Sequence, residues 1–546
     1  MSVVTILSAR KIITMNPGLP EASHVAIRDG RILAVGNAED MKCWPDAAQD
    51  TRFADKVLMA GFVEGHSHIM EGSVWPYPYV GYFDRVSPEG VKVSGLTSID
   101  AVVERLKAAS DAMADPNEIL FAWGFDPIYF GDRRMTRQDL DRVSTTRPVL
   151  VIHASFHIIN VNSFAMQKVG IDRSSNIDGV PKAADGEPAG ELQGVAARVR
   201  LFRGLNWHAL RDTVSAESVQ RYARSAIING VTTLTDLHNE MSEESTTHFR
   251  AETAKPDFPM RLVPALSRVG STIDQVIARI KELKAGNTDK LHFGMVKLVV
   301  DGSIQGFTAR LRWPGYHNGA ENGLWYIAPD ELFEIVGKLH AAHVHMHIHT
   351  NGDEATELTL NAIEAAQFAH YWADHRHTLQ HCQMASPAQF KRMKALGVCA
   401  NLFSNHVYYW GDQHYATTMG PERANRINAA GTAKRLGVPF ALHSDAPVTP
   451  LGPLFTAWCA VNRVTASGRL LGADERLSVA DALAAVTIGS AYTMRMDHLV
   501  GSIETGKYAD FVVLEQDPLA VDPMKLKDIA IWGTICGGQA NQAPKQ

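Results

Sequence analysis

The feature that most constrains this chain is a repeated alternation of short apolar runs of β-strand type with segments long enough to form helices. Two of the expected helices cover Pro329–Ala342 and Pro387–Leu396. Strands that alternate with helices favour a parallel sheet, and eight such units predict an α/β fold of the (β/α)8 TIM-barrel type. The eight runs are Val57–Phe62, Val231–Asp236, Arg261–Leu266, Met295–Val300, Val344–His349, Thr378–His381, Val398–Phe403 and Pro439–Ser444.

The two ends of the chain carry a different pattern. Asp29 and Gly30 stand between two short apolar runs, which is a strong hairpin signal, and Gly506 marks a turn before the strand-like residues 511–514. Both ends therefore predict β structure that assembles into one small domain. The expected organisation is a composite β-sandwich from residues 1–56 plus 498–546, a barrel over 57–497, and an inserted lid or subdomain over 75–199.

The amino-acid composition argues against several other classes of protein. The 546 residues are 45% hydrophobic and 21% charged, which is ordinary for a globular protein, and the net charge of −6 gives no reason to expect nucleic-acid binding. Five scattered cysteines without a CxxC pair indicate a reducing compartment. The first ten residues lack a signal-peptide pattern, and no apolar run reaches about 18 residues, so we expect no membrane segment and a cytoplasmic protein.

Histidines stand where two of the expected strands end. His66 and His68 follow the first run, and residues i and i+2 of a strand point to the same face, so both imidazoles can reach one metal ion. Two ordinary polar loop histidines are the alternative. The fifth run ends in His349 at the expected catalytic mouth, whereas His345 and His347 lie deeper and are interpreted as hydrogen-bonded core residues.

Two further strand ends and the interior of one strand carry residues that could take part in metal binding. The sixth run ends in His381 and the eighth leads into Asp445, although a core histidine and a helix cap are the plainer interpretations of each. Lys297 lies inside the fourth apolar run, where a free ammonium group is costly. It therefore needs either a salt bridge, for example to Asp301, or conversion by carbon dioxide to a carbamate that could bridge two cations.

Together these residues resemble the amidohydrolase superfamily, in the branch called amidohydrolase family 3 that includes N-substituted formamide deformylase-like proteins. The resemblance extends over nearly the whole chain, and it departs from the family pattern at Ala60, Glu64 and His443. The segments that carry it are Gly61–His68, Phe156–Ser163, Gly230–Thr233, Val296–Ser303, His349–Asp353, His381, Ser444–Pro447 and Gly501–Asp510.

The resemblance implies a ligand set for two divalent metal ions. His66 and His68 would hold the more buried ion together with Asp445, and His349 and His381 would hold the more exposed one. A carboxylated Lys297 would bridge them. Zinc suits such imidazole and carboxylate ligands best, and manganese, iron or cobalt are the alternatives.

The implied activity is metal-dependent hydrolysis of an amide-type C–N bond in a small N-acyl or N-formyl amine, with Asp445 as general base. The alternatives are a deaminase, a lactone or carbamate hydrolase, an isomerase, or a relative that binds without catalysis; a homodimer is also compatible with the resemblance. Candidate substrate contacts, each with a packing or loop role as its alternative, are His157, Trp123, Asn405 and His406.

Overall fold

The structure is a computed structural model that describes residues 3–131, 133–177, 179–207, 213–268 and 270–544. The chain divides into two compact units. The first contains the chain up to His68, Tyr222–Ala446 and the residues from Leu451 onward, and the second contains Ile69–Arg221 with Pro447–Pro450. The expected insertion of 75–199 lies inside this second unit.

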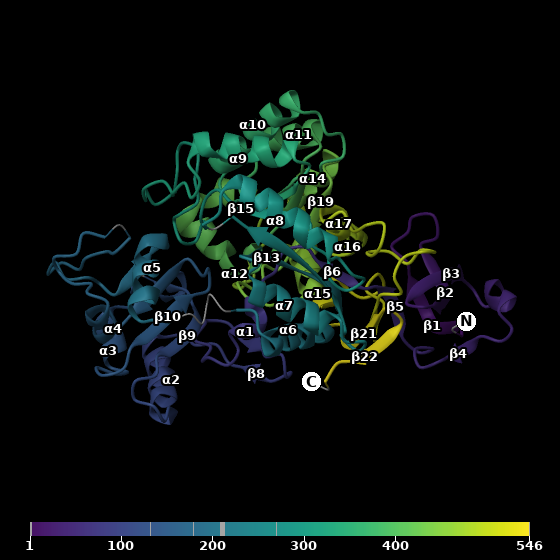
Figure 1. The fold of residues 1–546 in the computed structure, drawn as a ribbon, viewed down its shortest axis with the longest axis horizontal. Coiled ribbons are helices and arrows are strands. Elements are labelled where there is room, and N and C mark those ends of the chain that lie inside the picture. The colour runs from purple at the N-terminus through teal and green to yellow at the C-terminus, as the bar shows by residue number, and fades with distance from the viewer. Residues whose placement is uncertain (1–2, 132, 178, 208–212, 269, 545–546) are drawn as a thin grey trace. The chain divides into compact units, whose positions relative to one another are not determined.

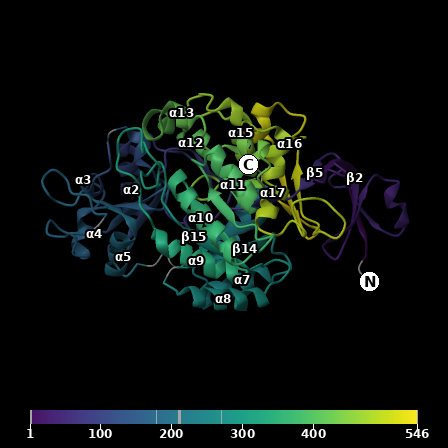
Figure 2. The same ribbon diagram turned by 90° about the horizontal axis from the view of Figure 1, so that it is seen from above.

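The first unit contains a parallel eight-stranded barrel, as the sequence predicts, with helices such as α8 (Ile273–Ala285) on its outer side (Figures 1 and 2). A parallel bridge between Ser67 and Ala446 joins the first strand end to the last, and the His68 amide donates to the Ala446 carbonyl at 2.8 Å. In spatial order the strands are β6 (Phe62–Glu64), β13 (Val231–Asn239), β14 (Arg261–Ser267), β15 (Met295–Val299), β16 (His345–Thr350), β17 (Thr378–His381), β18 (Cys399–Leu402) and β19 (Phe440–Leu442).

The two helices expected from sequence are α9 (Pro329–Ala341) and α11 (Pro387–Leu396). A proline occupies the first turn of each, where its missing N–H has no intrahelical acceptor to lose. Helix α11 begins with a capping box in which Ser386 and Gln389 satisfy each other's backbone amides, and it ends at Gly397 in the left-handed region. Local sequence therefore sets where these helices begin and end.

Strand register decides which side chains share a layer inside the barrel. Lys297 on β15 is paired with His347 on β16, and His349 on β16 is paired with Gln380 on β17. Residues two apart on a strand face the same way, so Lys297, His347 and His349 belong to the same series of alternating positions. This register brings the chemistry-bearing side chains of three strands close to the carboxyl ends of the barrel.

The two chain ends pair into a single hydrogen-bonded sheet of eight strands, so both ends contribute to one β structure. The run expected to be the first barrel strand is divided at Gly61, where a Cβ atom would lie 2.2 Å from Thr232 Oγ1. Its first half joins the terminal sheet and its second half is barrel strand β6. The terminal strands are β1 (Thr5–Ile13), β2 (Glu21–Arg28), β3 (Arg31–Gly36), β4 (Ala48–Asp50), β5 (Val57–Ala60), β20 (Phe511–Leu514), β21 (Ile531–Cys536) and β22 (Gln539–Gln542).

The second unit has its own four-stranded sheet and apolar core. Its helix α2 (Ile99–Ala112) begins at Ser98, whose side chain accepts the Ala101 amide. Trp123 and Phe121 are buried in this core. The strands, in spatial order, are β12 (Glu191–Gln193), β11 (Ile158–Val161), β10 (Val149–His153) and β9 (Leu120–Phe125).

Within the described ranges, no helix combines the length and the apolar character that crossing a bilayer requires. All five cysteines are free, four of them buried and Cys43 exposed.

Candidate metal centre

Four of the six predicted ligands meet at the mouth of the barrel. The Nε2 atoms of His66 and His68 lie 3.3 and 3.1 Å from Asp445 Oδ1, and the ligand atoms of these three residues all lie within 4.8 Å of one another. His381 Nδ1 is 3.9 Å from Asp445 Oδ2. Two imidazoles and a carboxylate around one point form a ligand set that suits a divalent ion such as zinc.

His349 lies beside this group. It ends strand β16, and its ring lies 4.5 Å from the ring of His381 at an interplanar angle of 72°. Its Nε2 atom lies 3.3 Å from the Gly302 carbonyl oxygen. The structure therefore brings His349 and His381 together as neighbours at the mouth, as the predicted second ion requires.

Lys297 points into the same cluster, where a histidine is its polar neighbour. Its Nζ atom lies 3.4 Å from His66 Nε2, and no carboxylate of the described residues forms an ion pair with it. The alternative salt bridge to Asp301 is wrong, because that carboxylate accepts backbone amides from Arg310, Asn351 and Gly352 instead. Burial lowers the pKa of Lys297 to about 7, against the opposing charge of Asp445.

A chain of hydrogen bonds fixes the tautomer of His66. The Thr493 carbonyl can only accept, so His347 Nε2–H donates to it at 3.0 Å and His347 Nδ1 must accept. Gln380 Nε2 donates to that atom at 2.7 Å, and the amide oxygen of Gln380 therefore accepts from His66 Nδ1–H at 2.6 Å. The lone pair of His66 lies on Nε2, the atom that faces Asp445.

This tautomer shows that the residues fit a cation. A neutral imidazole nitrogen and a carboxylate oxygen are both acceptors, and at 3.3 Å they repel unless positive charge lies between or beside them. Lys297, 3.4 Å from the same nitrogen, supplies that charge while it is protonated, and a bound cation would supply it otherwise. Burial holds the pKa values of His66 and His381 well below their usual range, so both imidazoles stay neutral. Burial also raises the pKa of Asp445, but the hydrogen bond and charge of His68 offset this, and the net shift is downward. Neutral imidazoles and an ionised carboxylate are the forms that bind metals.

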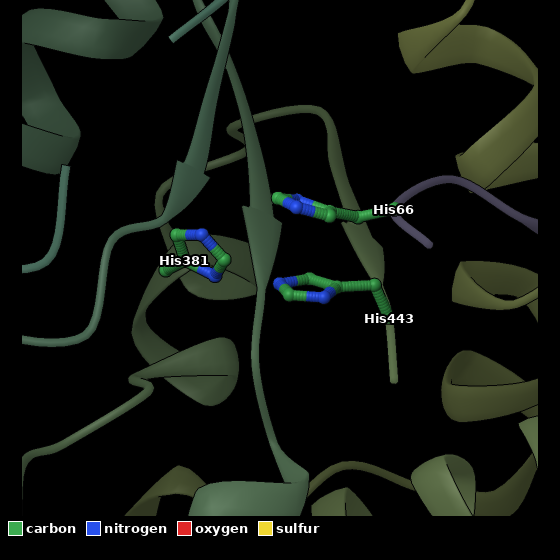
Figure 3. Close-up of side chains that lie close together, drawn as sticks. All are labelled: His66, His381 and His443. Atoms are coloured by element: carbon green, nitrogen blue, oxygen red, sulfur yellow. The ribbon is translucent and has the colours of Figure 1, made fainter. Parts of the chain in front are cut away.

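The sequence showed Glu64 and His443 only as departures from the family pattern, and it did not single out Gln380. The buried Glu64 carboxylate accepts the Ser444 amide at 3.2 Å and the Ser444 hydroxyl at 2.9 Å, so it fixes the loop that carries Asp445. Burial raises the pKa of Glu64 to about 8. His443 stacks on His66 with ring centroids 4.6 Å apart and an interplanar angle of 18° (Figure 3). The available signal for His443 was its position two residues before Asp445.

The predicted substrate contacts divide between the two units. Asn405 and His406 begin helix α12 (Asn405–Gln413) directly after β18, and both are buried at the mouth of the barrel. Trp123 is completely buried in the core of the second unit, which favours its packing alternative. His157 lies between β10 and β11 of that unit, and its predicted contact with substrate stays a prediction.

His406 is oriented by its own hydrogen-bonded partners. Its Nδ1 atom lies 3.1 Å from His414 Nε2, and His414 Nδ1 lies 2.7 Å from Thr418 Oγ1. The Phe403 ring lies 4.5 Å from His406 and 5.7 Å from His381. Phe403 therefore forms an aromatic contact between His406 and the histidine cluster.

Neutral imidazoles surround a carboxylate where the strands of this parallel barrel end. This arrangement is typical of metal-dependent barrel hydrolases. Residues 54–540 match the amidohydrolase family, and the chain belongs to this family of metal-dependent hydrolases, which confirms the resemblance seen in the sequence.

Known relatives match over most of their length. The chain is 27% identical to the putative amidohydrolase YtcJ of Bacillus subtilis (strain 168), covering 94% of this chain and 95% of that protein. It is 24% identical to the N-substituted formamide deformylase of Arthrobacter pascens, with coverages of 95% and 94%. An uncharacterized metal-dependent hydrolase from Pyrococcus horikoshii OT3 has the same fold, with a TM-score of 0.71, 20% identity and coverages of 95% and 99%.

Proposed function

We propose that this hydrolase cleaves an amide-type C–N bond in a small N-acyl or N-formyl amine, and that two divalent ions, best matched by zinc, support the reaction. The observation that carries the proposal is the cluster of His66, His68 and Asp445, in which His66 presents its Nε2 lone pair to a carboxylate oxygen at 3.3 Å. His349 and His381 would hold the second ion beside this cluster.

Lys297 would bridge the two ions as a carbamate. Only a neutral amine attacks carbon dioxide, and burial lowers the pKa of Lys297 to about 7, so much of the amine is neutral near physiological pH. The reaction forms a bond between Nζ and the carbon of carbon dioxide, and the nitrogen loses one proton to solvent. The resulting anion places two oxygens inside a pocket that contains no other ion-pair partner for Lys297 among the described residues.

When bound, such ions supply a nucleophile by lowering the pKa of water, and they polarise a substrate carbonyl. Asp445 is the group that moves the proton: it lies at the centre of the cluster, accepts it from the attacking water and delivers it to the leaving nitrogen. Glu64 keeps the Asp445 loop in place through Ser444. Asn405 and His406 would contact the substrate at the mouth, with His406 oriented by His414.

The amide-type substrate class has support from relatives. The chain aligns with nearly the full length of the N-substituted formamide deformylase of Arthrobacter pascens at 24% identity. An N-formyl amine has a small acyl group and a variable amine, so a formyl-specific pocket would have to exclude larger acyl groups. The expected homodimer and cytoplasmic location stay predictions.

The test begins with the metal content of protein purified without chelator and in the presence of bicarbonate. Elemental analysis is expected to give about two zinc-like ions per chain. Formyl, acetyl and longer acyl derivatives of one aromatic amine are then compared by release of the amine, and ammonia release is measured in parallel. Amine release by the wild-type protein but not by Asp445→Asn supports the proposal. Ammonia release alone would indicate a deaminase, and no turnover by a metal-replete enzyme would contradict the amide class.

A further inference from the structure

His443 is a buried histidine whose hydrogen-bonding capacity is unused. Its side chain is completely buried, and neither ring nitrogen has a hydrogen-bond partner among the described residues. A neutral imidazole carries one donor and one acceptor, and leaving such a group unsatisfied in the interior costs about 1–3 kcal/mol. A buried polar group in this state calls for an explanation such as an ion or a ligand.

Other buried histidines of the same unit behave differently. His347 donates to Thr493 and accepts from Gln380. His377 accepts the Met346 amide at 3.2 Å and lies 2.9 Å from His340 through its other nitrogen. Each of these two histidines has a partner for both ring nitrogens, whereas His443, at the metal centre, has none among the described residues.

Ring orientation decides which ion His443 could reach. The lone pair of an imidazole nitrogen lies in the ring plane. The rings of His443 and His66 are nearly parallel and 4.6 Å apart, so one ion cannot lie in both planes. The ring of His381 is inclined at 63° to His443 at a distance of 5.0 Å, and the two planes therefore intersect nearby. Figure 3 shows His66 and His443 one above the other with His381 beside them.

Distances allow His381 and His443 to share one ion. The ligand atoms of His66, His381 and His443 lie within 4.8 Å of one another. Two nitrogens bound to one zinc ion at about 2.0–2.1 Å in tetrahedral geometry stand about 3.4 Å apart. A side-chain movement of about 1 Å brings His381 and His443 to that separation.

We propose that His443 is an additional ligand at the mouth of the barrel, which binds, together with His381, the divalent transition-metal ion on the His349 side. The ion between His66, His68 and Asp445 does not involve it. This inference rests on the proposed metal function and adds a ligand to it, in that the last barrel strand would serve both ions: Asp445 one and His443 the other.

The test compares His443→Leu, which removes both nitrogens at similar volume, with the control His414→Leu. His414 is also completely buried near the mouth, but both of its nitrogens have partners in His406 and Thr418. Each protein is loaded with Zn²⁺, the bound ions are counted by elemental analysis, and the affinities are measured by competition with a chromogenic chelator. Visible absorption of the Co²⁺-substituted proteins reports loss of a nitrogen ligand directly.

We expect His443→Leu to retain one ion with unchanged affinity and to bind the other at least about 10-fold more weakly. Its thermal stability without metal should not fall, whereas His414→Leu should melt earlier and keep both affinities. His443→Gln, which retains a polar ligand atom, serves as a second variant if His443→Leu does not fold. If either folded variant keeps both zinc affinities and the Co²⁺ spectrum of the wild type, His443 is not a ligand. That result would leave the proposed metal-dependent function standing. A wild-type protein that binds no divalent ion would overturn the proposed function as well.

Discussion

Replacing Gln380 by methionine tests how the barrel prepares His66 for a metal ion. The change keeps an unbranched side chain of similar length but removes the amide that accepts from His66 Nδ1–H at 2.6 Å and donates to His347 Nδ1 at 2.7 Å. It also removes the acceptor of Asn401 Nδ2, at 3.0 Å. Three buried polar groups lose their partner, and at about 1 kcal/mol for each the folded state should lose about 3 kcal/mol.

The effect on metal binding is the more specific consequence. Without an acceptor at Nδ1, His66 is no longer held in the tautomer that places its lone pair on Nε2 facing Asp445. Loss of a partner that orients a metal-binding histidine typically weakens metal affinity 10–100-fold, which is about 1.4–2.7 kcal/mol. We expect zinc affinity, measured by chelator competition, to fall within this range at pH 7.

A matched control is available in the turn that follows β17. Gln383 is also buried, but both of its amide atoms lack a hydrogen-bond partner among the residues described. Gln383→Met should therefore leave zinc affinity unchanged and should not lower stability. Equal affinities for the two variants, or a Gln380→Met affinity within about threefold of wild type, would refute the argument that the hydrogen-bond chain sets the His66 tautomer.

Three further perturbations test the general base, the bridging lysine and the pH dependence of stability. Asp445→Asn should reduce turnover at least about 100-fold with the fold retained, as measured by steady-state kinetics and circular dichroism, and an active metal-replete variant would exclude the general-base role. Lys297→Ala should lose the metal pair, with partial recovery of bound metal and turnover on adding a short carboxylate such as formate; two ions bound without it would contradict a bridging carbamate. Burial lowers the pKa of His345 to about 3 and of His375 to about 4, from 6.5. As the pH falls below 6.5, the unfolded state takes up these protons before the folded state does. The free energy of unfolding should therefore fall by about 2 kcal/mol for each histidine between pH 7 and pH 5. Urea unfolding of the metal-free protein measures this change, and a free energy that is constant over this range would contradict it.

The barrel could be predicted because the residues that begin and end each strand or helix lie within or next to that segment of the sequence. Strand β17 and helix α11 have the bounds that the sequence predicts, since the apolar run, the proline and the Gly397 stop signal are all within the segment. The run from 57 to 62 could not be divided in the same way. Its first half pairs with β20, more than 450 residues further along, and apolar residues suit both a terminal sheet and a barrel.

The ligand residues of the site could be predicted from two sequence features: the alternation of side chains along a strand and the position of each strand end. His66, His68 and Asp445 meet as that reasoning requires. The hydrogen-bond chain through Gln380 was not predictable, because it depends on the register that pairs His349 with Gln380 across two strands. No local pattern in either strand specifies that register.

The barrel holds several buried histidines, three of them on β16, and burial alone is therefore a poor guide to their function. His347 and His443 are both completely buried and both face neighbouring imidazoles, so position and burial do not separate them. Their hydrogen bonds do: His347 has a partner for each nitrogen, and His443 has none among the described residues. A histidine with partners on both nitrogens must give up one hydrogen bond to bind an ion. An unsatisfied one recovers its desolvation cost only when something binds to it, and for that reason the search for ligands in such a barrel should begin with the histidines that lack partners.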